Sequence, residues 1–163
     1  MNLKQIEPTT VEVSGIKFII TPFSAFKAAN ISGELATVLA PVFGTLLPLV
    51  KNQKNGIGDI DVEDATKAIS SCAAINGDKL EALMKKLLLN GNVSVEMNDE
   101  NGEADVQRLD IDVANEVFCG EVQDMFRLCF EVIKVNYSGF FEKLLNRSGK
   151  VKSEEKKKKR RIL

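Results

Sequence analysis

Carboxylates are the residues of this chain that most readily suggest chemistry, and they gather in two places. One group has four carboxylates within six residues, and the other is the loop Asn98–Glu103 (NDENGE). Carboxylates this close together can hold a divalent cation or act as an acid and a base. The members of the first group are Asp59, Asp61, Glu63 and Asp64.

Neither group has the other residues that such chemistry needs. Gly56-Ile57-Gly58, beside the first group, lacks the further glycine and the Gly-Lys-Ser/Thr of a phosphate-binding loop. The loop at Asn98–Glu103 lacks the ligand spacing and flanking helices of an EF-hand calcium loop. We therefore interpret the first group as helix caps and the second as a hairpin turn, with a metal site as the alternative in each case.

The residue types that are missing narrow the function further. The chain has no histidine and no tryptophan, which excludes a His base, a His ligand and a Ser-His or Cys-His pair. Cys72, Cys119 and Cys129 are odd in number and never form C-x-x-C, so they fit neither a disulfide framework nor a zinc site. We expect reduced, packed thiols, no cofactor, no catalytic or metal-binding residue, and no enzymatic activity.

The charge of the chain is divided unevenly along its length. The formal net charge is −1, but residues 150–161 hold eight basic and two acidic residues, a net charge of +6, which leaves −7 for the rest. A basic run attracts phosphate, yet this one lacks interleaved aromatics and the body offers no basic face. Solvation, an acidic partner and nucleic acid remain open for this segment, and nothing else in the chain favours nucleic acid.

The elements that position these residues begin with a hairpin and a long apolar helical region. Alternating β-favouring residues on both sides of Ser14-Gly15 predict two short strands that end at Pro22. Helical spacing then runs from Phe23 to Val50, and Pro41 should break or kink it, giving two successive helices. The uncharged run within this region, Leu35 to Val50, is shorter than the roughly 20 apolar residues of a membrane span, so we expect a buried helix and no membrane partner.

The second half of the chain repeats this alternation of helices and strands. We expect a helix from about Val62 to Ala74 and another capped by Asp78, whose leucine stripe ends at Asn90-Gly91. A second hairpin follows. Its apolar positions are Val93, Val95 and Met97, then Val106, Leu109 and Ile111.

The predicted helices of the C-terminal third are long and aromatic. Asp112 is expected to cap a helical region that reaches Asn136, and a short final helix covers Tyr137 to Leu145. Five aromatic residues here either complete the core or form a groove that holds a partner's helix. This candidate partner-binding set is Phe118, Phe126, Phe130, Phe140 and Phe141.

The predicted fold is α+β and mainly helical, with two short β-hairpins and about five to six helices. Its length of 163 residues fits one domain, which we place at residues 1–147, followed by a basic flexible tail at 148–163. The chain opens without an apolar segment and small-residue cleavage site of a secretory signal, so a cytoplasmic location is expected.

The C-terminal pattern also resembles a known family. Phe118-Cys119-Gly120, an amphipathic helix and then Asn136-Tyr137-Ser138-Gly139-Phe140-Phe141 are similar to the "Phe-x-Gly … Asn-aromatic-x-x-Phe-Phe" ending of tail assembly chaperones encoded by tailed bacteriophages and prophages. The order of the preceding segments fits as well. They are a short hairpin, a proline-interrupted apolar helix pair (Ala36 to Val50), a polar loop, a Leu-rich helix and a second hairpin, so the resemblance covers nearly all of 1–147.

This resemblance implies a non-enzymatic role in virion assembly. Such chaperones bind the long, largely helical tape measure protein, keep it soluble and help to recruit tail tube protein, inside the bacterial host cell. The resemblance also implies a longer product made by ribosomal frameshifting near the end of the reading frame. Four consecutive lysines, Lys156 to Lys159, are compatible with an A-rich slippery sequence, which would require an overlapping downstream frame in the gene.

Three other interpretations of the sequence stay open at this point. One is a structural tail or baseplate component, which would be found in purified particles. Another is a basic-tailed nucleic-acid accessory protein, whose binding to DNA or RNA would be lost with Lys150 to Leu163. Self-association of the chain is also possible on the sequence alone.

Overall fold

The described part of the chain contains a four-stranded antiparallel sheet and four helices, which confirms the predicted α+β class. The computed structural model describes residues 7–51, 63–64, 67, 76–98 and 101–137. Its elements are β1 (Thr9–Val13), β2 (Ile16–Ile20), α1 (Ala25–Lys51), α3 (Gly77–Leu88), β3 (Val93–Asn98), β4 (Ala104–Arg108), α4 (Ile111–Val117) and a last helix over residues 122–137.

The first hairpin has the predicted strands and turn. Ser14 and Gly15 both have positive φ, at 50° and 82°, as a two-residue type I′ turn requires. This turn sets the register, in which Val13 lies opposite Ile16 and Val11 opposite Phe18. Val13, Phe18 and Ile20 are buried as a result, because alternate residues of a strand share one face.

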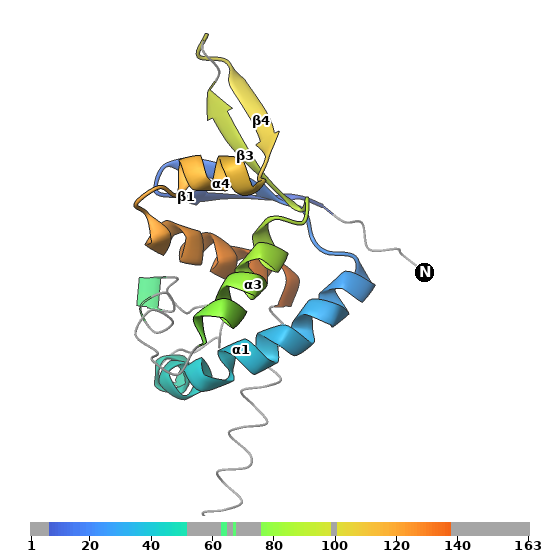
Figure 1. Cartoon of the computed structure of the whole chain (residues 1–163), viewed down its shortest axis with the longest axis vertical. Coiled ribbons are helices and arrows are strands. Elements are labelled where there is room, and N and C mark those ends of the chain that lie inside the picture. Colours follow the sequence, from blue (N-terminus) through green and yellow to red (C-terminus); the bar gives the residue numbers. More distant parts are fainter. Residues whose placement is uncertain (1–6, 52–62, 65–66, 68–75, 99–100, 138–163) are drawn as a thin grey trace, which may run out of the picture.

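The second hairpin is also confirmed, and it joins the first in one sheet of order β1-β2-β3-β4. β2 pairs with only part of β3, from Val93 to Glu96. The remainder of the β3–β4 hairpin projects from the body of the molecule (Figure 1), and we call it the arm. All five residues of β4 are exposed. The segment at 98–104 therefore connects two paired strands.

The long apolar helix differs from its prediction at Pro41. α1 is assigned as one helix from Ala25 to Lys51, so the prediction of two successive helices was wrong. Proline removes one i→i−4 hydrogen bond and displaces the preceding turn, but the ladder can resume beyond it, which gives a kink. The last part of α1 turns away from the direction of its first part in Figure 1.

The leucine stripe of α3 is buried as predicted. Leu83, Met84, Leu87 and Leu88 lie in the core. The cap, however, is Asn76 and not Asp78, since the Asn76 side chain accepts a hydrogen bond from the Lys79 N–H at 3.1 Å. Asparagine and aspartate are equally good N-caps, because the side-chain oxygen of either accepts a hydrogen bond from a free backbone N–H of the first turn.

The C-terminal helical region begins earlier than predicted and is interrupted. Asp110 caps α4 by accepting hydrogen bonds from the N–H groups of Asp112 and Val113, so Asp112 is not the cap and Ile111 is helical. Gly120 then takes a φ of 77°, a left-handed conformation that ends α4 and that other residues adopt at a cost. The predicted single helix is therefore two.

Helices from both halves of the chain pack on the sheet to form one core cluster. The last helix lies between the sheet and α1 in Figure 1. Phe26 lies in the region of predicted apolar helical spacing from Phe23 to Val50, yet it is 93% exposed. Cys129 is buried, as expected, but Cys119 is exposed, because it lies in the turn between α4 and the last helix.

Some predicted elements lie outside the described residues. These are Cys72, the tail at 148–163, most of the helix from Val62 to Ala74, and the helix after Tyr137. Of the first carboxylate group, Glu63 and Asp64 are described, and both are helical and exposed. Glu63 forms an ion pair with Lys67 at 3.0 Å, at i,i+4 spacing.

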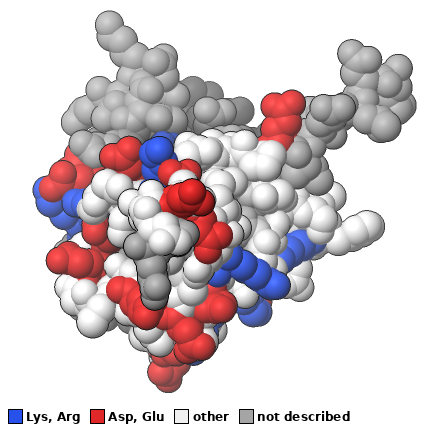
Figure 2. Space-filling view, turned by 90° about the horizontal axis from the view of Figure 1, so that it is seen from above, with Lys and Arg blue, Asp and Glu red and all other residues white. Residues whose placement is uncertain are grey.

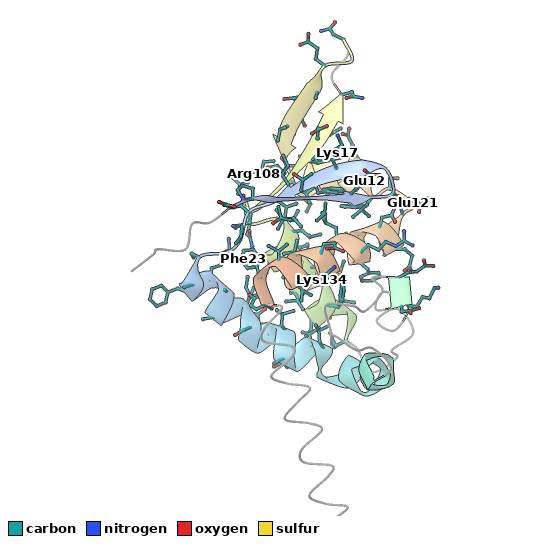
Figure 3. The ribbon with its side chains drawn as sticks, turned by 180° about the vertical axis from the view of Figure 1, so that it is seen from behind. Glu12, Lys17, Phe23, Arg108, Glu121 and Lys134 are labelled. Atoms are coloured by element: carbon teal, nitrogen blue, oxygen red, sulfur yellow. The ribbon has the colours of Figure 1, made fainter. Side chains whose placement is uncertain are left out.

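The end of the last helix is fixed to the start of α1. The Asn136 side chain accepts a hydrogen bond from the Phe23 N–H at 2.7 Å, and the Tyr137 hydroxyl donates to the Ala28 carbonyl at 2.8 Å. The Tyr137 ring meets the Phe23 ring edge-on, with centroids 6.4 Å apart. Figure 3 shows Phe23 at one side of the molecule and Glu121, at the other end of the last helix, at the opposite side.

Replacing Tyr137 with phenylalanine should reduce stability in a way that depends on pH. Loss of one hydrogen bond costs about 1 kcal/mol at neutral pH. Burial raises the pKa of Tyr137 to about 12, whereas an unfolded tyrosine ionises near pH 10. The wild-type contribution is therefore present below about pH 10 and is lost as the pH rises towards 12. Urea unfolding between pH 8 and pH 12 should show that the free energy of unfolding falls more steeply with pH in the wild type than in Tyr137→Phe. If the free energies of both proteins fall in parallel, this prediction is wrong.

Candidate partner-binding groove

An apolar groove lies between α3, α4 and the start of the last helix. Its volume is about 400 Å³, within the range of pockets that bind ligands or side chains. Apolar side chains from all three helices form most of its lining. They are Leu80, Met84, Leu88, Leu89, Ile111, Ala114, Val122, Met125 and Phe126.

The groove exposes apolar surface to solvent. Ile111 is 51% exposed and Val122 is 52% exposed, and both line it. The described part of the chain has four exposed large hydrophobic residues, and the other two are Phe26 and Val106. Half of these residues therefore lie in the groove. Exposed apolar residues that gather in a concave surface mark a contact site for a partner more often than isolated ones do.

Local sequence explains why the groove stays open. Gly77, at the first position of α3, has no side chain, and nothing lies within 4 Å of the place where a Cβ would be. Ala114, on the facing side of α4, is small and only partly buried. The turn at Phe118–Gly120 holds α4 at a distance from the last helix that their own side chains do not fill.

The polar residues of the groove are few. Glu81 and Lys85 form an ion pair at 2.6 Å across one turn of α3, with both side chains largely in solvent. Lys85 lowers the pKa of Glu81 through a hydrogen bond and its charge. Asn115 completes the polar lining. Among the described lining residues, the groups that could act as a base or a nucleophile are Glu81 and Lys85, and these are paired with each other.

The structure separates the five aromatic residues of the predicted partner-binding set. Phe118 stacks on Phe18 of β2 with centroids 5.8 Å apart and is buried. Phe130 is 8% exposed and belongs to the core cluster. Phe126 is half-buried and lines the groove. Phe140 and Phe141 lie outside the described residues.

Sequence reasoning did not identify the other groove residues. Phe126 was in the predicted set, but Val122 and Met125, which have i, i+3, i+4 spacing with it, were predicted only as part of a long helix. Gly120 could have indicated the exposure of Val122, since a glycine at this position allows the chain to change direction before the last helix begins. Ile111 was assigned to a strand, where its exposure could not be anticipated.

A second depression lies between the turn of the first hairpin, β3 and α4. Its volume is about 620 Å³, and it is more polar, with Lys17, Glu96 and Glu116 in its lining. Lys17 and Glu96 form an ion pair at 3.4 Å across the paired strands. Among the described residues, no group of three or more His, Cys, Asp or Glu side chains is arranged to hold a metal ion.

The residues of the Phe-x-Gly and Asn-aromatic motifs have structural roles. Phe118 packs α4 on the sheet and Gly120 makes the turn before the last helix. Asn136 and Tyr137 fix the end of that helix to α1. These motifs therefore position two of the three helices that line the groove, α4 and the last helix.

One of three comparisons with known proteins identifies a family for this chain. Within the described residues, no helix has the combination of length and apolar character that crossing a membrane requires. Searches of curated proteins and of solved structures gave no significant match. The sequence profile described as "Phage tail assembly chaperone protein, TAC" matches residues 14–149, most of the chain and all of the elements from β2 onward. The chain therefore belongs to the phage tail assembly chaperone family, which is non-enzymatic.

Proposed function

We propose that this protein binds the tape measure protein of a tailed phage, keeps it soluble and assists assembly of the tail tube. The binding is carried out by a domain of residues 1–147 in the cytoplasm of the bacterial host. The observation that carries the proposal is the open apolar groove, with Ile111 and Val122 half-exposed at its surface. Phe126, from the predicted aromatic set, contributes to its lining.

The groove suits a client that is held for a time and then released. A long client helix exposes apolar side chains that aggregate unless they are covered. Each side chain of this kind gains about 1.5–3 kcal/mol on burial. The ordering of both partners offsets much of this gain. A groove of this size therefore supports moderate affinity, so that packing of the client into a tail can displace the chaperone.

Co-expression with the tape measure protein of the same phage tests this function. The full chain carries an affinity tag, and the soluble fraction is assayed for the tape measure protein before and after pull-down. We expect more tape measure protein in the soluble fraction and its retention with the tagged chain. A tape measure protein that is equally soluble without this chain and is not retained would refute the proposal.

A further inference from the structure

The part of the chain that forms the arm and two of the three walls of the groove is strongly acidic. The described residues at 96–98 and 101–124 belong to the β3–β4 hairpin, α4 and the start of the last helix, and they contain eight acidic residues and one basic residue, a net charge of −7. Figure 2 looks down on the arm and shows acidic side chains gathered around and below it. This charge equals the net −7 of the whole chain outside residues 150–161, so the acidic and basic residues elsewhere in that part of the chain cancel.

Acidic residues lie in the lining of the groove or next to lining residues in the chain. Glu81 is part of the lining. Asp112 follows Ile111 in the chain and Glu121 precedes Val122, and both acidic side chains are exposed. Lys85 is the basic residue of the lining, and it is already paired with Glu81. The charged pair in the lining is thus neutral overall, and the exposed residues next to Ile111 and Val122 in the chain are negative.

The walls of the groove determine the shape of its partner. All three walls are helices, whose backbone N–H and C=O groups are used within each helix, so they provide no edge on which a strand could pair. An amphipathic helix fits such walls, because its side chains at i, i+3, i+4 and i+7 form one apolar stripe. A strand would instead pair with the outer edge of β4, where Val106 is exposed.

We propose that the groove selects an amphipathic client helix whose apolar stripe is flanked by lysine and arginine. This inference rests on the proposed function, since the tape measure protein would supply the segment. The apolar stripe enters the groove, and the flanking cations lie against Asp112 and Glu121. Opposite charges at a rim increase the rate of association and reject like-charged helices, and salt weakens both effects.

Fluorescence anisotropy with two labelled peptides tests this selection on the full chain. Both peptides carry the same apolar stripe and are designed for equal helicity, but one has Lys and Arg at the flanking positions and the other has Glu. We expect the basic peptide to bind at least tenfold more tightly at 50 mM NaCl, with the ratio falling at 500 mM. Asp112→Asn with Glu121→Gln should reduce that ratio, while Val122→Asp should weaken binding of the basic peptide itself at least tenfold.

Three outcomes would overturn the proposed preference for a client helix flanked by lysine and arginine. They are equal binding of the two peptides, undiminished binding of the basic peptide to Val122→Asp, and equally tight binding of a peptide of residues 150–163. The last peptide carries the +6 of the tail without an apolar stripe, so its binding would show recognition by charge alone. If the tape measure protein is retained while the two peptides bind equally, the selection fails and the proposed function stands. If the tape measure protein is neither retained nor kept soluble, the proposed function fails.

Discussion

Val122→Asp is expected to weaken retention of the tape measure protein at least tenfold while leaving the fold intact. The substitution places a carboxylate where the partner's apolar stripe would lie, and burial of an unpaired charge costs several kcal/mol. Val122 is 52% exposed and begins the last helix. An acidic residue in a first turn interacts favourably with the helix dipole, so the free energy of unfolding should change little.

Val106→Asp is the matched control for this experiment. Val106 has almost the same exposure, at 53%, and the chemical change is identical, but it lies on β4 and away from the groove. Pull-down of the tape measure protein should be reduced by Val122→Asp and unaffected by Val106→Asp. The reverse pattern would place the client on the edge of the arm.

Phe130→Asp is expected to prevent accumulation of soluble, folded protein. Phe130 is 8% exposed within the core cluster, and loss of a buried phenylalanine alone costs about 3–5 kcal/mol. The buried carboxylate adds a desolvation cost of several kcal/mol. Together these costs approach or exceed the roughly 5–15 kcal/mol that keeps a domain folded. Soluble yield and the cooperativity of thermal unfolding measure the effect.

Phe26→Asp is the control for the same chemical change at an exposed position. Phe26 is 93% exposed in the first turn of α1, so this variant should be produced and unfold like the wild type. If Phe130→Asp also folds normally, the side chain must lie in solvent, and Phe130 would return to the candidate contact residues.

Local patterns in the sequence were sufficient for the hairpins and for α3. Ser14-Gly15 determined the turn and register of the first hairpin, because both residues must take positive φ there. The leucine stripe identified the buried face of α3. In these elements, the signal and the structure that it specifies lie within a few residues of each other.

The errors arose where neighbouring signals compete or where tertiary packing decides. Asp110 and Asp112 are both good caps, and Asp110 is the one that accepts the first-turn N–H groups. Pro41 was expected to end a helix, but α1 continues through it. Phe26 has helical spacing with its buried neighbours yet faces solvent, since the width of the buried face depends on which elements cover it.

The groove was beyond prediction for the same reason. It exists because α3, α4 and the last helix meet without filling the space between them, and such a gap is a property of three elements that are distant in the sequence. The sequence did indicate a hydrophobic helical surface in the C-terminal third. It could not separate Phe126, which lines the groove, from Phe118 and Phe130, which lie in the core.

Site-specific photo-crosslinking in the complex with the tape measure protein tests the central claim most directly. A photoreactive amino acid is incorporated at position 122, in the groove, and separately at position 106, on β4, and each purified complex is irradiated. We expect a crosslinked product from position 122 and little or none from position 106. A crosslink from position 106 with none from position 122 would contradict the claim.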